Sequence, residues 1–379
     1  MATRAYAMNE SRTLPNSTRV PGILRHLIDL SGSFATDTDR ITYIHIYARP
    51  PAGDDQEEWR PIRAAESGPE GIACVDDVAR AAILALQAYR QLRVPAAREL
   101  GRTWLGFLTH MQDSDGRFTN FIIDRAGRRN RRGRTSYPGG PWWTARALWA
   151  LAVGFRVTGD EQYLHMLERA HPTRTTNLKV TAIRAMALME WYECRPTDAL
   201  QRRIFHLCDR LVAAGPDYFR DRKGRDELYP WGYHQLQAVA RAGRVFSRID
   251  YLTACEHTVD NAVKPLIAGG FGEIAPWRQA PRCVYDVSTL MLGLEELYTA
   301  TGHERYRDLA LACVDWLYGA NPAGEALYDP RTGRCGDGVT ESGVSANCGA
   351  ESTIEAGFME LARRRLQSGE SSRVQPRSK

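Results

Sequence analysis

The feature that most constrains the fold is a repeated helix–glycine–turn–helix unit. The segments RVTGDEQYLHML (156–167) and TATGHERYRDLA (299–310) are near copies, and FSRIDYLTACE (246–256) is a looser third version. In each near copy the glycine suits a left-handed helix C-cap, and a short polar turn leads into a second amphipathic helix. Recurrence of one such unit predicts a repeat architecture built from αα-hairpins.

Apolar residues spaced three and four positions apart predict five helical pairs and one last helix. The segment 17–32 predicts a further helix, which would close a ring of six hairpins if it paired with the last one. Strand-like text is confined to 41–48 and 117–124. We therefore expect an all-α (α/α)6 toroid with minor β structure in loops, an open helical array being the alternative. The expected helices are about 72–92 with 96–113, 141–158 with 160–170, 177–193 with 197–213, 231–247 with 249–266, 283–300 with 303–318, and 350–366.

Segments with helical periodicity extend over most of the 379 residues, so we expect a single barrel domain at 17–367. A flexible N-terminal tail (1–16) should precede it. A disordered C-terminal tail (368–379) should follow it, because that segment has no periodicity and few apolar groups.

Composition and charge exclude several function classes. No apolar run is long enough for a membrane span and the first residues lack a signal-peptide core, so we expect a cytoplasmic protein without a membrane partner. The net charge of +5 comes from arginines spread along the whole chain, and the arginine cluster at 125–134 has no accompanying DNA-binding motif, which argues against nucleic acid. The eight cysteines form no CxxC pair, and no cofactor or metal is expected.

The first helix of each pair opens with polar and aromatic residues. In a toroid these first helices run parallel, so their openings meet at one rim. Aromatic faces that stack on sugars and carboxylates that exchange protons suit a carbohydrate site there. The openings lie at 71–77, 138–149, 175–186, 226–236, 273–290 and 345–356.

Three acids at helix starts are the candidate catalytic residues: Asp76, Asp77 and Glu351. Helix capping is the alternative role for acids in a first turn, and for Asp286 capping and function are evenly matched. Only one of the two consecutive tryptophans at 142–143 needs to face the core. The candidate substrate-binding residues are Asn120, Trp142, Trp143, Arg146, Tyr229, Trp231, His234, Trp277, Tyr285, Asp286, Asp337 and Asn347.

Several motifs resemble the six-hairpin glycosidase superfamily, and more specifically an all-helical bacterial domain found alone or beside glycosyltransferases. They are VDDVARAAILAL (75–86), DGRFTNF (115–121), ARALWALA (145–152) and the stretch 301–356 with YGANPAG and NCGAES. The last stretch is also similar to family-nine glycoside hydrolases, although the Asp-Ala-Gly-Asp motif of that family is missing. The resemblance implies a base-like role for Asp76 or Asp77 and an acid role for Glu351.

The leading hypothesis is a glycoside hydrolase acting on an oligosaccharide. A carboxyl separation of roughly 6.5–9.5 Å would indicate inversion, and about 5–5.5 Å retention. A polysaccharide lyase or sugar epimerase is the alternative, with Tyr229, His234 or Tyr285 as base and Arg146 or Arg278 as the cation. A non-catalytic carbohydrate-binding module that assists a glycosyltransferase is the third hypothesis.

The loop 321–349 is too long for a routine connection between helices. It leads directly into the helix that carries Glu351. We therefore expect it to fold over the cleft and to contribute Asp337, Glu341 or Asn347 to sugar binding.

Overall fold

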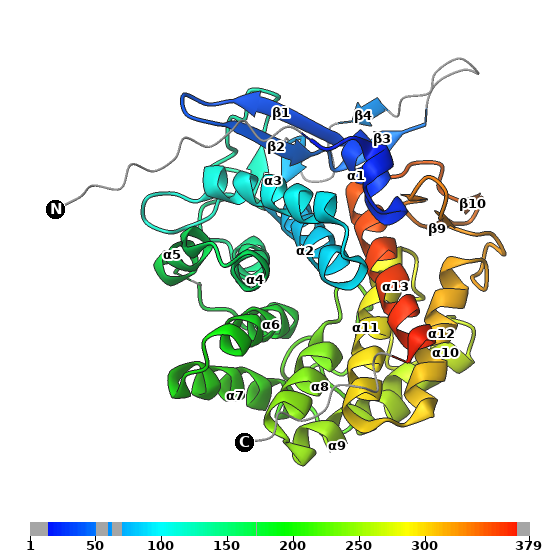
Figure 1. Cartoon of the computed structure of the whole chain (residues 1–379). Coiled ribbons are helices and arrows are strands. Elements are labelled where there is room, and N and C mark those ends of the chain that lie inside the picture. The colour runs from blue at the N-terminus through cyan, green and yellow to red at the C-terminus, as the bar shows by residue number, and fades with distance from the viewer. Residues whose placement is uncertain (1–13, 51–59, 63–69, 172, 370–379) are drawn as a thin grey trace.

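The computed structural model describes residues 14–50, 60–62, 70–171 and 173–369. Its helices pair in the predicted order, and each pair places one helix inside and one outside the barrel (Figure 1). The pairs are α2 (Val75–Leu92) with α3 (Pro95–Met111), α4 (Pro141–Thr158) with α5 (Glu161–Arg169), α6 (Leu178–Cys194) with α7 (Asp198–Val212), α8 (Gln235–Phe246) with α9 (Ile249–Thr258), and α11 (Val284–Thr301) with α12 (Glu304–Leu317).

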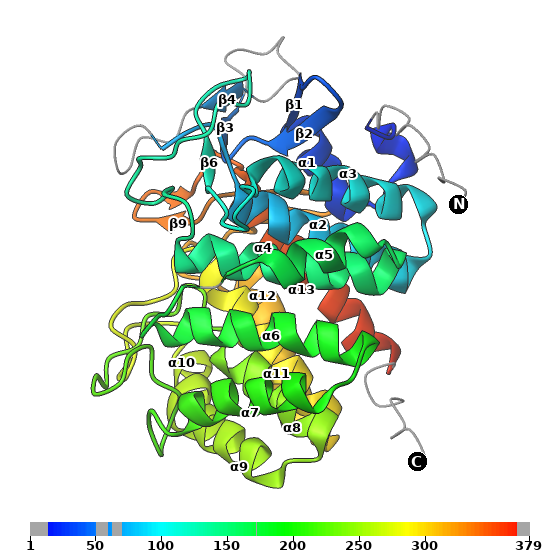
Figure 2. The same ribbon diagram turned by 90° about the vertical axis from the view of Figure 1, so that its left-hand side faces the viewer.

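The inner helices close into a ring. Each of α2, α4, α6, α8, α11 and α13 (Ala350–Ser368) contacts the next, and α13 returns to α2. Figure 2 shows α4, α6 and α7 as successive layers on one side of the molecule. Burial separates inner from outer helices: 13 of the 18 residues of α2 are buried, against 4 of the 15 in α7. The predicted (α/α)6 toroid is confirmed.

The sixth hairpin differs from the sequence prediction. In place of one long helix at 17–32, the structure has the short turns η1 (Ser17–Arg19) and η2 (Gly22–Leu24) and a five-residue helix, α1 (Arg25–Asp29). Of these pieces, η2 and α1 pack against α13, and the His26 Nε2 atom lies 2.9 Å from the Cys348 carbonyl oxygen just before that helix. The chain then turns into a strand at Ser31, so too few residues remain for a long helix.

Within the described residues the strands form five antiparallel pairs outside the barrel wall. Both predicted strand segments contain strands, at 40–44 with 47–49 and at 121–122, but none of the other strands was predicted. The pairs are β1 (Ser31–Ala35) with β2 (Arg40–Ile44), β3 (Tyr47–Arg49) with β4 (Arg60–Ile62), β5 (Ala73–Cys74) with β6 (Phe121–Ile122), β7 (Tyr328–Asp329) with β8 (Arg334–Cys335), and β9 (Val339–Thr340) with β10 (Gly343–Val344).

After α9 the chain continues through a π-helical turn, η3 (Val259–Val263), into the short helix α10 (Lys264–Ala268). Within the described residues, no helix combines the length and apolar character that crossing a membrane requires. The proposed tail 1–16 falls almost wholly outside the described residues, as does the tail 368–379 beyond Gly369.

Candidate active site

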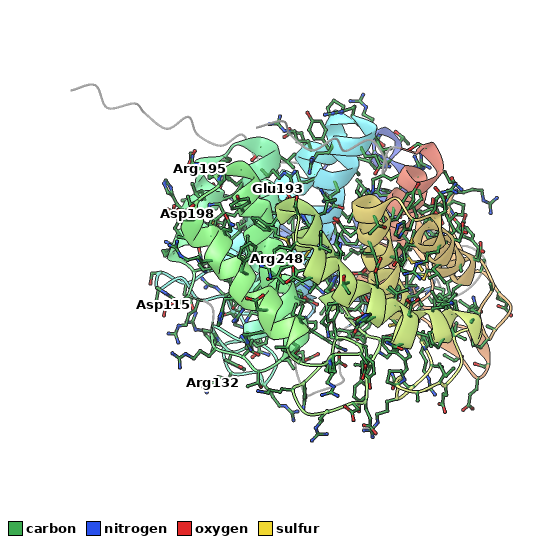
Figure 3. All side chains as sticks on the ribbon, turned by 90° about the horizontal axis from the view of Figure 1, so that it is seen from below. Asp115, Arg132, Glu193, Arg195, Asp198 and Arg248 are labelled. Carbon is green, nitrogen blue, oxygen red and sulfur yellow. The ribbon has the colours of Figure 1, made fainter. Side chains whose placement is uncertain are left out.

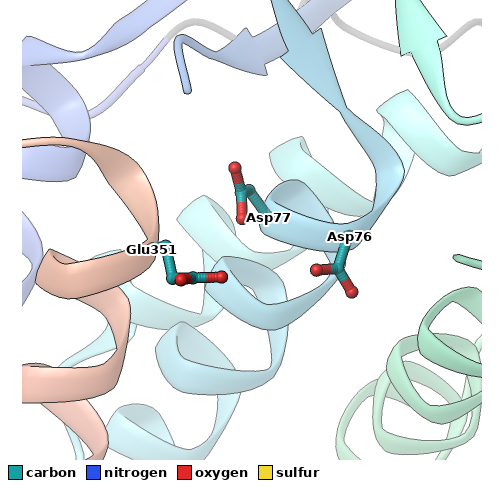
Figure 4. Close-up of side chains that lie close together, drawn as sticks. All are labelled: Asp76, Asp77 and Glu351. Carbon is teal, nitrogen blue, oxygen red and sulfur yellow. The ribbon is translucent and has the colours of Figure 1, made fainter. Parts of the chain in front are cut away.

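Three carboxylates from two helices meet where α2 and α13 begin (Figure 4). Asp76 and Asp77 lie in the first turn of α2, and Glu351 lies in the first turn of α13. One carboxylate oxygen from each residue lies within 4.8 Å of the other two. The structure thus brings together the three residues that the sequence singled out as catalytic. Their catalytic role remains a prediction.

The start of α2 is fixed by two side chains outside the helix. The Cys74 thiol accepts a hydrogen bond from the Asp77 backbone N–H at 3.4 Å, and Asn120 Oδ1 accepts one from the Asp76 N–H at 3.4 Å. Carboxylates are favoured at this end of a helix by the macrodipole. Asn120 therefore helps to set the direction of the two aspartates, and a direct contact with sugar remains a prediction.

A single buried arginine holds the carboxylates together. Arg80 is only 1% exposed, and its Nη2 atom lies 2.6 Å from Asp77 Oδ1 and 3.1 Å from Asp76 Oδ2. The same nitrogen lies 3.0 Å from Glu351 Oε2, while Nη1 lies 2.8 Å from Glu355 Oε1. The Arg80 guanidinium therefore supplies positive charge that all four carboxylates share.

A second buried cation lies beneath this cluster. Arg146 is fully buried, and its Nε atom donates to Asp76 Oδ1 at 3.0 Å. Its Nη2 atom lies 3.3 Å from His234 Nε2, and the Tyr285 hydroxyl lies 3.2 Å from the same ring nitrogen. The Arg146 Nη1 atom is buried without a hydrogen-bond partner among the described residues. This nitrogen can therefore donate to an oxygen of a bound substrate.

His234 is held in its neutral form. Its Nδ1 atom lies 2.9 Å from the side-chain oxygen of Gln237, an acceptor, so Nδ1 carries the hydrogen and Nε2 the lone pair. Burial, followed by the positive charge of Arg146, lowers the pKa of His234 well below its usual value.

An aromatic wall borders the carboxylates. Trp142 and Trp231 stack with ring centroids 5.0 Å apart, and the Trp231 indole N–H donates to Glu351 Oε1 at 3.1 Å. With Tyr229 and Lys179 they line a cavity of about 280 Å³. The other lining residues are polar or charged (Asn177, Asp221, Arg222, Arg225 and Glu227), so the cavity combines three aromatic side chains with groups that can form hydrogen bonds. Of the two consecutive tryptophans, it is therefore Trp142 that faces this cavity.

Burial gives Asp77 an unusual proton affinity. Its burial raises the pKa of Asp77 to about 7, and the Arg80 guanidinium opposes that rise. The carboxylates of Asp76 and Glu351 add to the rise because like charges disfavour ionisation. Perturbed carboxyl groups of this kind cluster at functional sites.

Two of the predicted tryptophans lie away from the cluster, in the core. Trp143 is buried and donates its indole N–H to the Phe118 carbonyl at 2.8 Å. Trp277 is also buried, and its indole N–H donates to the Ala262 carbonyl at 2.8 Å. In this arrangement both rings pack against protein and present no open face for stacking on a sugar.

Asp286 caps a helix. Its Oδ2 atom accepts the backbone N–H groups of Arg282 at 2.7 Å and Cys283 at 3.0 Å, at the start of α11. Of the two roles that were evenly matched in the sequence, the geometry favours capping, since these contacts use the carboxylate to satisfy helix-end donors.

The long loop 321–349 is anchored to the start of α13. Asp337 Oδ1 accepts the Gly349 N–H at 2.6 Å, and the Asp337 N–H donates to the Asn347 carbonyl at 2.9 Å. Glu341 is exposed. Because Gly349 lies two residues before Glu351, the loop sets the position of a candidate catalytic carboxylate. Sugar binding by Asp337 and Asn347 stays a prediction.

We expect Asp337→Ala to lower the free energy of unfolding by about 1–3 kcal/mol, because the Gly349 N–H loses its acceptor. Urea titration measures the effect. Glu341→Ala, in the same loop but exposed, is the matched control and should change stability by less than about 0.5 kcal/mol. Equal, small effects of both variants would show that the loop does not hold α13 in place.

Two residues of the cluster, Arg80 and Glu355, were not predicted. Arg80 follows Asp77 by three residues and Asp76 by four, which places all three on one helix face. Glu355 follows Glu351 by four, and its second oxygen accepts the Ser288 hydroxyl at 2.6 Å. The spacing of these charged residues is evident in the sequence, but the apolar residues around them gave no indication of a site.

Solved structures resemble the chain, whereas no protein-family model and no curated protein matches it. A D-mannose isomerase is 10% identical with a TM-score of 0.65, over 92% of this chain and 96% of that one. A sugar epimerase from a ruminal bacterium is 14% identical with a TM-score of 0.61, over 80% and 94%. A family 76 glycoside hydrolase from a bovine Bacteroides thetaiotaomicron strain is 13% identical with a TM-score of 0.60, over 92% and 76%.

Similarity at this level of identity shows the fold alone, which is an (α/α)6 barrel, as the sequence predicted. A polysaccharide lyase and a cellulase from C. cellulolyticum have it too, so the predicted likeness to family nine extends to the fold. Because one fold carries several sugar chemistries, the reaction depends on the side chains at the rim.

Proposed function

We propose that the chain is a glycoside hydrolase that cleaves an oligo- or polysaccharide where α2 and α13 begin. The observation that carries the proposal is the convergence of Asp76, Asp77 and Glu351 beside an aromatic-walled cavity. A pair of carboxyl groups flanking the scissile bond is the machinery of most glycosidases. A hydrolase is among the structures of this fold, as are an epimerase, an isomerase and a lyase, so the proposal rests on the carboxylates.

The electrostatics favour Asp77 as the acid and Glu351 as the nucleophile, the reverse of the roles implied by the sequence resemblance. The raised pKa of Asp77 keeps a proton available near neutral pH. Glu351 is the more accessible group, with 31% of its side chain exposed, and it accepts hydrogen bonds from Trp231 and Arg80. Such donors stabilise a charged carboxylate.

The reaction then proceeds in two steps. Asp77 gives its proton to the glycosidic oxygen as the bond to the anomeric carbon breaks, and Glu351 attacks that carbon to form an ester. In the second step Asp77 takes a proton from water, and the resulting hydroxide displaces Glu351. Asp76, held between Arg80 and Arg146, keeps both guanidinium groups in place.

We expect the product to retain the anomeric configuration of the substrate. One oxygen of Asp77 and one of Glu351 lie within 4.8 Å of each other, which is nearer the separation of about 5–5.5 Å in retaining enzymes than the roughly 6.5–9.5 Å that leaves room for a water in inverting ones. Proton NMR during the first minutes of turnover reads the configuration before mutarotation. An inverted first product would rule out Glu351 as a nucleophile.

One observation favours a second candidate, a sugar epimerase or isomerase. His234 is neutral, and its Nε2 lone pair lies beside the Arg146 guanidinium, so it could take the proton next to a sugar carbonyl. Both the isomerase and the epimerase of this fold act on sugars by name. Arg146 and Tyr285 already occupy that lone pair, which is why the hydrolase is preferred.

Incubation with a panel of oligosaccharides separates the candidates. Hydrolysis creates new reducing ends. Epimerisation or isomerisation in deuterated water places deuterium on the sugar without new ends. A lyase yields an unsaturated uronate that absorbs ultraviolet light. A non-catalytic module that assists a glycosyltransferase binds sugar and gives no product at all. Only the formation of new reducing ends supports the proposal.

A further inference from the structure

The six inner helices carry charged residues at their C-terminal ends as well as at the rim. These side chains line a second cavity of about 510 Å³, which extends from the Arg80 layer to the last turns of the inner helices. Figure 3, seen from below Figure 1, shows Glu193 nearer the middle of the molecule than Arg195 and Asp198. The carboxylate cluster lies at the opposite ends of the inner helices, in the first turns of α2 and α13.

Charges alternate around most of this ring. Arg156 of α4 pairs with Glu190 and Glu193 of α6, at 2.6 Å each. Arg241 of α8 pairs with the same two glutamates, also at 2.6 Å. Arg244 of α8 then pairs with Glu296 of α11 at 3.1 Å, and Arg365 of α13 with Glu295 of α11 at 2.6 Å. From α4 to α13 the signs therefore run plus, minus, plus, minus, plus.

The alternation fails at α2, the sixth helix. Where an acid would complete the ring between Arg365 and Arg156, α2 presents Arg90 and Arg93. Neither has an ion-pair partner within the described ranges, and both line the cavity. Burial, and then the positive charge of Arg156, lower the pKa of Arg90. The positive charges of Arg156 and Arg241 therefore disfavour the charge on Arg90, while Glu190 and Glu193 favour it.

Arg93 has a backbone conformation that is unfavourable for a residue with a side chain. Arg93 is the C-cap of α2 with φ of 58°, whereas α4, α11 and α13 have glycine at the same left-handed position. A side chain in this region is less favourable than glycine. The position is therefore occupied by a cation where glycine would fit more easily.

We propose that a phosphate-containing anion binds where α2 lacks an acid in the ring, held by Arg90 and Arg93. A phosphate completes the alternating ring with the negative charge that α2 lacks, and guanidinium groups match phosphate oxygens with paired hydrogen bonds. The ligand is inorganic phosphate or a small phosphate ester. Arg90 and Arg93 lie in the last turn and at the C-cap of α2, whereas Asp76 and Asp77 lie in its first turn, so this site is at the other end of the helix from the proposed hydrolytic one.

Calorimetric titration of the full chain tests the proposal, with inorganic phosphate and with glycerol phosphate at constant ionic strength. Arg90→Glu should weaken phosphate binding by about tenfold to a hundredfold, the value of a hydrogen bond to a charged group. The same variant supplies the missing acid, so its Tm in phosphate-free buffer should exceed that of the wild type. Arg93→Gln gives a second reading if Arg90→Glu does not fold.

Arg202→Glu, an exposed charge reversal on the outer helix α7, is the matched control and should bind phosphate as the wild type does. Tighter binding of glycerol phosphate identifies an ester as the ligand, and tighter binding of inorganic phosphate identifies the free ion. The proposal is overturned if neither probe binds, or if Arg90→Glu and Arg202→Glu bind equally well. Arg90 and Arg93 would then only stabilise the negative, C-terminal ends of the helix dipoles.

Discussion

Asp77→Asn and Glu351→Gln should each lower kcat by about a thousandfold or more, because acid catalysis alone contributes 10²–10⁴ and loss of a nucleophile costs more. Both variants keep the size of the side chain, so circular dichroism and Tm should stay close to wild type. Steady-state kinetics on the best substrate of the oligosaccharide panel measures the loss.

The matched control is Glu273→Gln, an exposed acid in the segment that precedes α11. It should leave kcat unchanged. Full activity of both the Asp77 and the Glu351 variant would contradict hydrolysis at these two carboxylates. Loss of activity in the glutamate variant alone would leave Asp77 without a catalytic role.

The pH dependence of the activity shows whether Asp77 acts in its protonated or its ionised form. The pKa of Asp77 is raised to about 7, so the acid is protonated below that pH and loses its proton as the pH rises through it. Activity should therefore decline above about pH 7. If activity instead rises through neutral pH, Asp77 acts as a base.

Arg80→Met should cost about 3–5 kcal/mol of folding free energy, because it leaves buried carboxylates without their cation. Four carboxylates touch this guanidinium: Asp76, Asp77, Glu351 and Glu355. Urea unfolding measures the loss. The loss should shrink at acid pH, where the carboxyl groups of the folded variant can take up protons.

Arg305→Met is the control for the loss of an arginine ion pair. Arg305 and Asp260 form an exposed pair, 47% and 43% exposed, and such pairs contribute about 0–1 kcal/mol. If Arg80→Met is no more destabilising than this control, the carboxylates do not depend on Arg80 for their burial.

The fold was predictable because the residues that specify each helix lie close together in the sequence. The three- and four-residue spacing of apolar groups located the inner and outer helices to within a few residues, and the glycines at 159 and 302 marked the turns between them. The sixth hairpin was not predictable in this way. Its outer half consists of short turns that tertiary contacts with α13 hold in place, and such contacts leave little periodicity in the sequence.

The site was partly predictable for a similar reason. Parallel inner helices bring their first turns together, so Asp76, Asp77 and Glu351 could be grouped before their distances were known. Which face a ring presents depends on packing that the sequence does not specify, so Trp142 and Trp143 could not be told apart. The same limit applies to Trp277, whose burial depends on neighbours distant in the chain.

The central claim is that water cleaves a glycosidic bond at Asp77 and Glu351. Mass spectrometry of products formed in water labelled with heavy oxygen tests it most directly, with the Glu351→Gln variant run alongside. We expect one labelled oxygen at each new reducing end with the wild type and none above background with the variant. Products that carry no label, or equal labelling by the variant, would contradict hydrolysis at this site.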